Sequence, residues 1–516
     1  MPASDISSNE DARGLLRHWA VLVLIMVLAA VLRCYRLGEE SLWNDETASI
    51  LYMDAGSLRQ FIVQERLDDP AMAPLYFTLE YFCWHATGGS ILACRFMSIG
   101  FGLGAIVMLF LMARRLFGPF AALVAAGCAA VAIQQVYYSQ EIRMYAPYLF
   151  FAMAAMYALH RILDGGRPVW WFVHALANAA MVWTHVYGIW LVFVQGLFFL
   201  AFRRKDFRSL LCWGAIHGPI VVSIALWVAT MDQARIERNL AWIPGPRSET
   251  ASQYLSESAL SLPGTRPAQD LPLRLDETLR LPLASKVLIG TGWVALPVCA
   301  GIATLRARRE LLRAKRKEEA RRKMRDFMLA FVWLAAPALI LLFLTLVWRP
   351  TFLPRYVFPS TLALYMLLGA GLAAVPGRRL RTVCAIAFIA LYAYDTLSFG
   401  MPRRPDMRRA MDVVTRQPFE ENGQLLVHPP GYTGPAKFYS QLPDAALVRM
   451  PEWREIPEKV DALAREGRPV WIVIGALQGV PPDVGPLLEE GGHAFDYHYF
   501  PGMFPVRLYH VPVHMH

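Results

Sequence analysis

The stretch Trp19–Leu32, WAVLVLIMVLAAVL, is soon followed by Leu42–Thr47, LWNDET. The first stretch is wholly apolar, and with its flanking residues it reaches the roughly 20 residues that a helix needs to cross a bilayer. The second places the carboxylates of Asp45 and Glu46 side by side near the expected membrane surface, where a charge loses part of its solvation. A spanning helix that leads into paired carboxylates predicts a membrane protein with a reaction centre at one surface.

The composition agrees with a polytopic membrane protein. The 516 residues are 56% hydrophobic and 18% charged, with a mean hydropathy of +0.34, whereas a soluble protein carries about 25% charged residues. The net charge is +10 and the pI about 9.3. The basic residues gather in short segments between apolar runs, as the positive-inside rule describes, so the charge does not indicate a nucleic-acid partner.

The N-terminus begins like a secretory signal, with Arg13 and Arg17 before the apolar run. No small-x-small cleavage pattern follows the run, so we expect an uncleaved first helix and a cytoplasmic segment 1–15. Placing the basic segments in the cytoplasm predicts a membrane domain over 16–400 with about eleven spanning helices. We expect these helices at about 16–34, 91–113, 119–137, 144–163, 168–185, 188–202, 209–230, 284–305, 327–348, 356–375 and 382–399.

The same topology assigns the connecting segments. Residues 35–90 form a first outer loop, in which the short apolar piece Pro74–Ala86 is expected to lie in the membrane interface as a helix. Residues 232–283 form a second outer loop. Residues 306–325 contain eleven basic residues and are expected to be a cytoplasmic loop, with binding of anionic lipid head groups as an added function.

Residues 401–516 differ in character from the rest of the chain. They are polar and proline-rich, with short apolar runs typical of strands at 425–427, 470–474 and 506–509. Helix-like segments lie between them, at about 406–416, 453–466 and 483–490. Alternating strands and helices predict a small α/β domain, which the topology places outside the cytoplasm.

The topology was built from loop charges alone, yet it brings a set of polar residues to one outer membrane level. Each has a structural alternative: arginines snorkel or cap helices, His185 fits a turn, Glu141 pairs with Arg143, and Asp45-Glu46 cap the following helix. Their convergence favours a substrate site. The residues are Asp45, Glu46, Glu141, Arg143, Tyr145, His185, Tyr187, Arg355 and Tyr356.

Carboxylates and arginines at an outer membrane surface suit sugar transfer. A partly desolvated aspartate is a suitable base for the proton of an attacking hydroxyl or amine. Nucleotide sugars are not available outside the cytoplasm, so a lipid-linked sugar phosphate, held by arginine, is the expected donor. The chain contains no Asp-x-Asp motif, which argues against a manganese–nucleotide-sugar site.

These residues resemble a known family. The segment from Leu37-Gly38 to Glu46 is similar to the first outer loop of the GT-C glycosyltransferases, especially the bacterial branch of the protein O-mannosyltransferases, which also resembles the lipid A aminoarabinose transferases. Tyr138–Tyr145 resembles that branch's second acidic motif, and Arg355-Tyr356 its late motif. The resemblance implies an inverting transfer from a polyprenyl-phosphate sugar, with Asp45 as the base, Glu46 and Glu141 on acceptor or sugar, and an arginine on the donor phosphate.

One departure bears on the donor. Related proteins carry His or Lys before Pro-Pro-Leu-Tyr, whereas this chain reads Met72-Ala73-Pro74-Leu75-Tyr76. The role of that basic residue passes to Arg143 or Arg355, or is absent. The sequence leaves open which arginine binds phosphate, which sugar moves, which acceptor receives it (glycolipid, polysaccharide or protein), and whether the acidic cluster holds a divalent cation.

Two other functions are compatible with the chain. A transporter or lipid-linked-sugar flippase would use the same polar residues as a substrate path, although the sequence shows none of the repeats expected of one. A non-catalytic assembly or receptor protein would use the outer α/β domain and leave the paired carboxylates unexplained. We favour the glycosyltransferase, in the inner or plasma membrane of a bacterial-type cell, with its site facing outward.

Overall fold

The computed structural model describes residues 3–68, 72–232, 283–348, 351–398, 404–416, 422–475, 481–501 and 505–512, with the single residues 234 and 237. Nearly all of the predicted outer loop 232–283 lies outside the described residues. The chain divides into two compact units. The helical unit holds Met1–Tyr35 and the described residues from Ile62 to Thr396. The second unit holds Arg36–Phe61 and the described residues from Leu397 onward.

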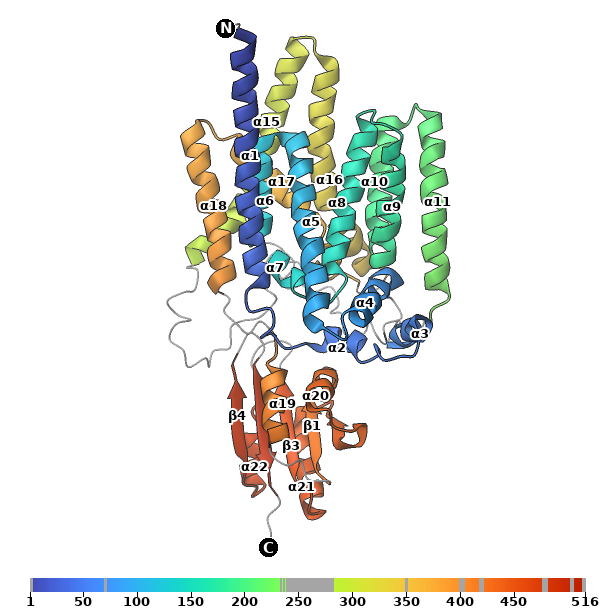
Figure 1. Cartoon of the computed structure of the whole chain (residues 1–516), viewed down its shortest axis with the longest axis vertical. Helices are drawn as coiled ribbons and strands as arrows, with labels where there is room; N and C mark the ends of the chain where they lie inside the picture. The colour runs from blue at the N-terminus through green and yellow to red at the C-terminus, as the bar shows by residue number, and fades with distance from the viewer. Residues whose placement is uncertain are drawn as a thin grey trace. The chain divides into compact units, whose positions relative to one another are not determined.

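The helical unit has a helix at each of the eleven predicted positions (Figure 1). Two shorter helices lie in the predicted first outer loop: α3 (Leu58–Asp68), and α4 (Pro74–Ala86), which begins with the proline in its first turn, as expected. The others are α1 (Ala3–Cys34), α5 (Ile91–Phe117), α6 (Pro119–Val131) with α7 (Ile133–Ser139), α8 (Tyr145–Leu163), α9 (Val169–Thr184), α10 (Gly188–Arg203), α11 (Phe207–Ala229), α15 (Leu283–Arg313), α16 (Lys317–Val347), α17 (Ser360–Ala373) and α18 (Arg378–Ser398).

Several of these helices have the length and apolarity of membrane spans. Among the described residues, five helices pass both criteria, and α6 with α7 makes a sixth candidate that is bent by 60°. The five lie in α1, α5, α8, α11 and α16. The protein is therefore a multi-pass membrane protein. The total of eleven spans stays a prediction, because the remaining helices do not meet both criteria.

Helix α17 lies against α6 and α15 at the centre of the helical unit. It is apolar around its whole circumference and almost every residue is buried, as expected of a helix covered on all sides. Two glycines permit this close packing. A Cβ atom at Gly369 would collide with the carbonyl oxygen of Ala121, and one at Gly371 with that of Leu296.

The helix predicted at 119–137 is broken. Ala132 adopts an extended conformation between α6 and α7, which frees the last carbonyl groups of α6. The fully buried Arg33 of α1 donates hydrogen bonds to two of them, those of Ala129 (3.1 Å) and Ala130 (2.9 Å). A buried guanidinium thus stabilises the bend, a long-range effect that apolar periodicity does not predict.

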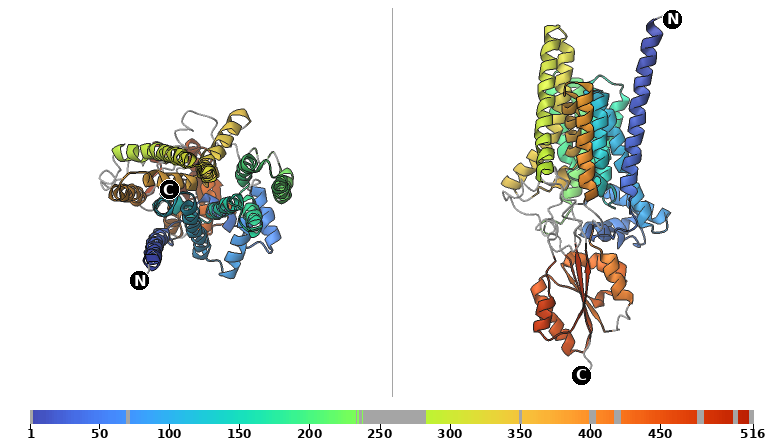
Figure 2. Two further views of the ribbon diagram at one scale, coloured as in Figure 1. Left: turned by 90° about the horizontal axis from the view of Figure 1, so that it is seen from above. Right: turned by 90° about the vertical axis from the view of Figure 1, so that its left-hand side faces the viewer.

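The second unit contains a five-stranded mixed sheet with helices on both faces, seen edge-on in Figure 2. The strand order is β2-β1-β3-β5-β4; β1 pairs with β2 and β3 in parallel, and β5 pairs with β3 and β4 antiparallel. The strands are β1 (Gln424–His428), β2 (Leu447–Arg449), β3 (Val470–Gly475), β4 (Asp496–Phe500) and β5 (Val506–Val511).

Two hydrophobic clusters fill the two faces of this sheet. One contains Met407, Met411 and Ala436, from α19 (Met407–Arg416) and α20 (Thr433–Ser440). The other contains residues of α21 (Ile456–Arg465) and α22 (Gly485–Glu490). Because both faces are covered, β3 is buried at every position. The strands β1, β3 and β5 and the helices α19, α21 and α22 coincide with the expected elements. The sequence analysis missed β2, β4 and α20.

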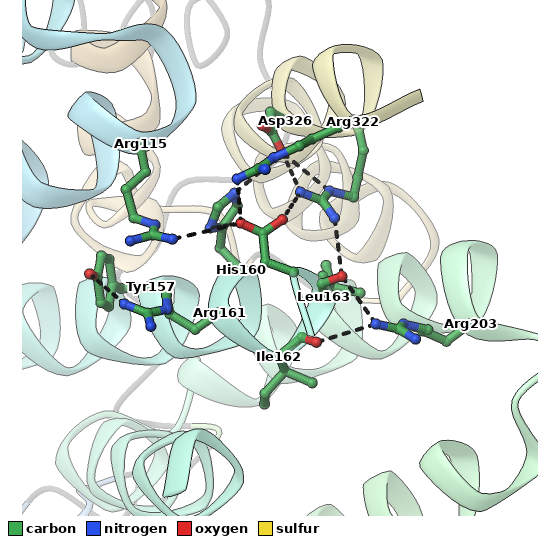
Figure 3. Close-up of polar contacts among 11 residues, drawn as sticks. Arg115, Tyr157, His160, Arg161, Ile162, Leu163, Arg203, Arg322 and Asp326 are labelled. Atoms are coloured by element: carbon green, nitrogen blue, oxygen red, sulfur yellow. Dashed lines mark hydrogen bonds and ion pairs between the residues drawn. The ribbon is translucent and has the colours of Figure 1, made fainter. Parts of the chain in front are cut away.

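A charged network joins four helices of the helical unit where α8 ends (Figure 3). Asp164, just after α8, forms ion pairs with Arg325 (2.5 Å) and Arg322 (2.7 Å) of α16. The buried His160 lies between Asp164 (3.7 Å) and Asp326 (3.3 Å). Burial by itself raises the pKa of Asp164, but the charges of His160 and the two arginines outweigh it and hold the pKa below its usual value.

Arginines also satisfy the end of α8 itself. Arg203 of α10 donates to the carbonyl oxygen of Leu163 at 3.1 Å, and Arg325 donates to the same oxygen at 3.2 Å. Arg115, at the end of α5, lies 3.8 Å from Asp164. Carbonyl groups without partners and cationic side chains attract each other at a helix C-terminus, so this network fastens the ends of α5, α8, α10 and α16 together.

Candidate functional site

In the helical unit, the three predicted tyrosines lie around His185. This residue follows α9 and occupies the turn before α10. The ring of Tyr148 stacks on the imidazole with centroids 4.8 Å apart, and the rings of Tyr187 and Tyr356 approach it edge-on at 5.7 and 5.5 Å. Tyr145 is slightly farther away, at 6.1 Å. Four aromatic rings from α8, the turn and the 3₁₀ helix η1 (Pro354–Val357) therefore enclose one histidine.

The hydrogen bonding of His185 defines its tautomer. The backbone N–H of Tyr187 donates to Nδ1 at 3.3 Å, so Nδ1 is the acceptor and the proton is assigned to Nε2. The side chain is only 4% exposed, and Nε2 has no hydrogen-bond partner among the described residues. Buried polar groups are nearly always satisfied. An N–H donor without a partner at this position indicates a place for a ligand acceptor.

Two arginines add positive charge to this region. The Arg143 guanidinium lies 5.4 Å from the ring of Phe77, and that of Arg355 lies 5.8 Å from the ring of Tyr356. His185 lies in the turn, outside the helices; burial, together with the smaller effect of the Arg355 and Arg143 charges, lowers its pKa to about 3. The histidine is therefore neutral at physiological pH. Two cations and a neutral donor make this region suitable for an anion.

An apolar pocket adjoins the histidine. It is small and shares Tyr148, Tyr187 and Tyr356 with the ring cluster. Trp190 and Trp333 line it as well, with residues of α16 and α17. Aromatic and aliphatic walls favour a hydrocarbon ligand. The positively charged region and this apolar pocket therefore lie side by side.

The second acidic motif is held by α1. Arg33 donates to the hydroxyl of Ser139 at 3.1 Å, and the side-chain amide of Gln140 donates to the carbonyl oxygen of Arg33 at 3.0 Å. These bonds position the turn that carries Glu141, which is fully buried, and Arg143, which is 6% exposed. The analysis of the sequence missed Arg33; its signal was an arginine inside the last turn of an apolar helix. A direct role for Glu141 stays a prediction.

In the second unit, Asp45 and Glu46 lie in the first turn of α2 (Asn44–Ile50). Nη1 of Arg404 lies 3.0 and 2.8 Å from the two carboxylate oxygens of Glu46, and Glu46 also accepts the backbone N–H of Trp43 at 3.3 Å. Glu46 is fully buried and Arg404 is 2% exposed. Asp45 is partly exposed. The two carboxylates therefore differ in burial: Glu46 is excluded from solvent, whereas Asp45 is partly exposed.

The structure thus distributes the nine predicted residues over its two units. Asp45 and Glu46 belong to the second unit and the other seven to the helical unit. Within the described residues, no group of three or more His, Cys, Asp or Glu side chains is arranged to hold a metal ion. The suggested divalent cation therefore gains no support from these residues.

Comparisons with known proteins bear on the fold of the chain. Residues 70–228 match the family model of dolichyl-phosphate-mannose-protein mannosyltransferases. Among solved structures, ArnT from Cupriavidus metallidurans bound to undecaprenyl phosphate is similar over 94% of this chain and 97% of its own, with 13% identity and a TM-score of 0.52. The chain has a GT-C fold. This confirms the predicted resemblance.

A second solved structure is similar to this chain at a lower TM-score. This structure is the oligosaccharyltransferase AglB from Archaeoglobus fulgidus, in complex with an inhibitory peptide and a dolichol-phosphate. The match covers 88% of this chain and 69% of the AglB chain. Its identity is 12% and its TM-score 0.49. No curated protein matches the chain in a sequence comparison.

Proposed function

We propose that this protein is a membrane glycosyltransferase that moves a sugar from a polyprenyl-phosphate donor to an extracytoplasmic acceptor. The observation that carries the proposal is the buried Nε2–H of His185. It lacks a hydrogen-bond partner among the described residues, is surrounded by aromatic rings, lies near two arginines and adjoins an apolar pocket. A lipid phosphate has the matching acceptor, charge and hydrocarbon. The GT-C fold and the ligand of the similar ArnT structure support this choice.

The donor phosphate is assigned to Arg143, Arg355 and His185. A guanidinium binds phosphate oxygens through two parallel N–H groups, and the neutral imidazole adds one more donor through Nε2. This assignment also accounts for the departure at Met72-Ala73, because these residues fill the role of the missing basic side chain. Tyr145, Tyr187 and Tyr356 provide aromatic surface for the sugar and the first part of the lipid.

Asp45 is assigned as the general base. Its carboxylate takes the proton of an acceptor hydroxyl or amine, and the acceptor atom attacks the anomeric carbon of the sugar. The bond between that carbon and the phosphate oxygen breaks, and polyprenyl phosphate leaves with the electron pair. A single displacement inverts the anomeric centre. The acceptor is a glycolipid, a polysaccharide or a protein.

A transfer assay with Asp45→Asn tests this function. Purified protein in lipid nanodiscs receives polyprenyl-phosphate sugars and acceptors extracted from bacterial membranes, and release of free polyprenyl phosphate is followed. We expect the asparagine variant to lose at least about a thousandfold in rate, because the amide cannot accept the proton. Asp54→Asn is the matched control, since Asp54 is exposed in the same loop and should leave the rate unchanged.

The outcomes separate the hypotheses. Wild-type release that disappears in Asp45→Asn but not in Asp54→Asn supports the transferase. Equal rates for wild type and Asp45→Asn reject Asp45 as the base. A flippase is favoured instead if the wild type releases no polyprenyl phosphate with any extract. In that case the protein, reconstituted into closed vesicles, should move lipid-linked sugar across the bilayer.

A further inference from the structure

The acidic loop and the C-terminal α/β domain form one compact unit, although more than 350 residues separate them in the chain. A buried ion pair between Glu46 and Arg404 connects them. A single guanidinium nitrogen contacts both oxygens of the carboxylate, at 3.0 and 2.8 Å. Both side chains are almost completely excluded from solvent. Breaking such a pair leaves a buried charge without compensation, which is strongly unfavourable.

Hydrogen bonds to the backbone fasten the segment before α2 as well. The N–H of Leu42 donates to the hydroxyl of Tyr439 in α20 at 2.6 Å. The N–H of Arg408 in α19 donates to the hydroxyl of Ser41 at 3.1 Å, and the Arg408 guanidinium donates to the carbonyl oxygen of Gly38 at 2.9 Å. The loop is therefore held by two helices of the α/β domain from Gly38 to Glu46.

The α/β domain also approaches α2 closely. A Cβ atom at Gly434 would lie 2.9 Å from the hydroxyl oxygen of Thr47, and one at Gly431 would lie 3.3 Å from the side-chain nitrogen of Asn44. A larger side chain at Gly434 would therefore require the Thr47 side chain to shift. Tyr432, between the two glycines, is buried in the hydrophobic cluster of the sheet. The segment that supports α2 is thus itself anchored in the domain core.

We infer that the α/β domain is a structural part of the catalytic centre, and that Arg404 is a positioning residue that orients Asp45 through the adjacent Glu46. The inference rests on the proposed function of Asp45. The two carboxylates share the first turn of α2, so a fixed Glu46 also fixes the backbone from which Asp45 extends. A displacement of about 1 Å in a reacting group costs about a hundredfold in rate.

Four variants of the full-length protein test this role: Arg404→Ala, Arg404→Lys, Tyr439→Phe and the control Arg409→Ala. Arg409 lies in the same segment, but its side chain is 66% exposed. Each variant is assayed with the extracted donors, and the number of competent molecules is counted by titration with undecaprenyl phosphate. Rates are then expressed per undecaprenyl-phosphate-binding molecule, with KM for the donor extract measured separately.

We expect Arg404→Ala to lower kcat per binding molecule about a hundredfold with an unchanged KM for the donor. Arg404→Lys should recover to within about tenfold of the wild type, because one ammonium nitrogen is able to contact both oxygens of Glu46, as Nη1 does. Tyr439→Phe removes one hydrogen-bond acceptor and should lower kcat about fivefold. Arg409→Ala should match the wild type.

A wild-type rate per binding molecule in Arg404→Ala overturns the inference, because it leaves Arg404 with a role in folding alone. If Arg404→Ala yields no folded protein, the other two variants decide. In that case the inference is overturned if Tyr439→Phe and Arg404→Lys have the same kcat as the wild type and hydrogen exchange in residues 38–50 is unchanged. Loss of activity in Asp45→Asn is the separate test of the proposed function and is run in parallel.

Discussion

Two regions flank α9: the charged network at Asp164, before the helix begins, and the ring cluster at His185, after the helix ends. Both contain arginines and a histidine, but their contacts differ. At the Asp164 end, arginines face carboxylates and the free carbonyl groups of α8. At the His185 end, two arginines lie near a neutral histidine whose Nε2–H has no partner among the described residues. A satisfied network stabilises the fold, whereas an unsatisfied buried donor between like charges costs stability. We therefore assign the first end to structure and the second to ligand binding.

This difference shows that arginine content alone does not identify a site. Positive residues at helix ends are expected at many positions of a membrane protein. The contacts separate the two cases: Asp164 and Asp326 pair with the arginines of one cluster, whereas the other contains a buried neutral histidine. The comparison leads to three predictions that measure activity and stability at the two ends.

The largest effect is expected from His185→Ala. Loss of the Nε2–H donor should lower the release of polyprenyl phosphate about a hundredfold, as for removal of one preorganised donor in other active sites. His185→Gln retains an N–H donor and should recover part of the rate. His85→Gln, at an exposed position in α4, is the control. A wild-type rate in His185→Ala would remove the phosphate assignment.

A smaller effect, on stability, is expected from Asp164→Asn. The amide keeps the shape of the side chain but leaves Arg325 and Arg322 without their anion, which should lower the free energy of unfolding by about 2 kcal/mol. Turnover per folded molecule should not change. Thermal unfolding in detergent and the release assay measure the two quantities.

The control for Asp164 is an exposed ion pair. Glu319 pairs with Arg316, and its side chain is 51% exposed. Glu319→Gln should change the free energy of unfolding by less than about 0.5 kcal/mol. Equal losses in Asp164→Asn and Glu319→Gln would show that the network at the end of α8 is not a structural fastening.

The smallest effect concerns pH. The unfolded state protonates His185 below a pKa of about 6.5, whereas the folded state resists protonation down to about 3. The contribution of His185 to the free energy of unfolding is therefore fully present above pH 6.5 and is lost as the pH falls toward 3. Between pH 7.5 and 5.5 the wild type should lose about 1 kcal/mol more than His185→Gln. Denaturant unfolding at both pH values measures this, and parallel curves would contradict it.

Much of the fold was determined by local features of the sequence. Apolar runs and the basic segments between them predicted the positions of the long helices, because backbone hydrogen bonding in a bilayer leaves few alternatives to a helix. In the α/β domain, the most apolar strands, β1 and β3, were also predicted. The three-residue strand β2 and the edge strand β4, with its exposed Tyr497, have no such pattern and were missed.

Part of the candidate site was also evident in the sequence. Loop charges placed the two acidic motifs and the late arginine motif on one side of the membrane, and the acidic pair at Asp45 and Glu46 stood out because charges at a membrane surface are costly. The sequence alone therefore determined where to look for the chemistry and which family the chain resembles.

The tertiary structure decided which contacts these residues make. Only the folded chain shows that Glu46 is bound by Arg404, 358 positions later, and that Asp45 is partly exposed. Only the fold shows that Arg33 caps the broken helix α6, and that the buried Nε2 of His185 has no hydrogen-bond partner among the described residues. These contacts join residues that are distant in the chain. Burial also changes the free energy of a charge or a hydrogen bond far more than the choice of residue type does.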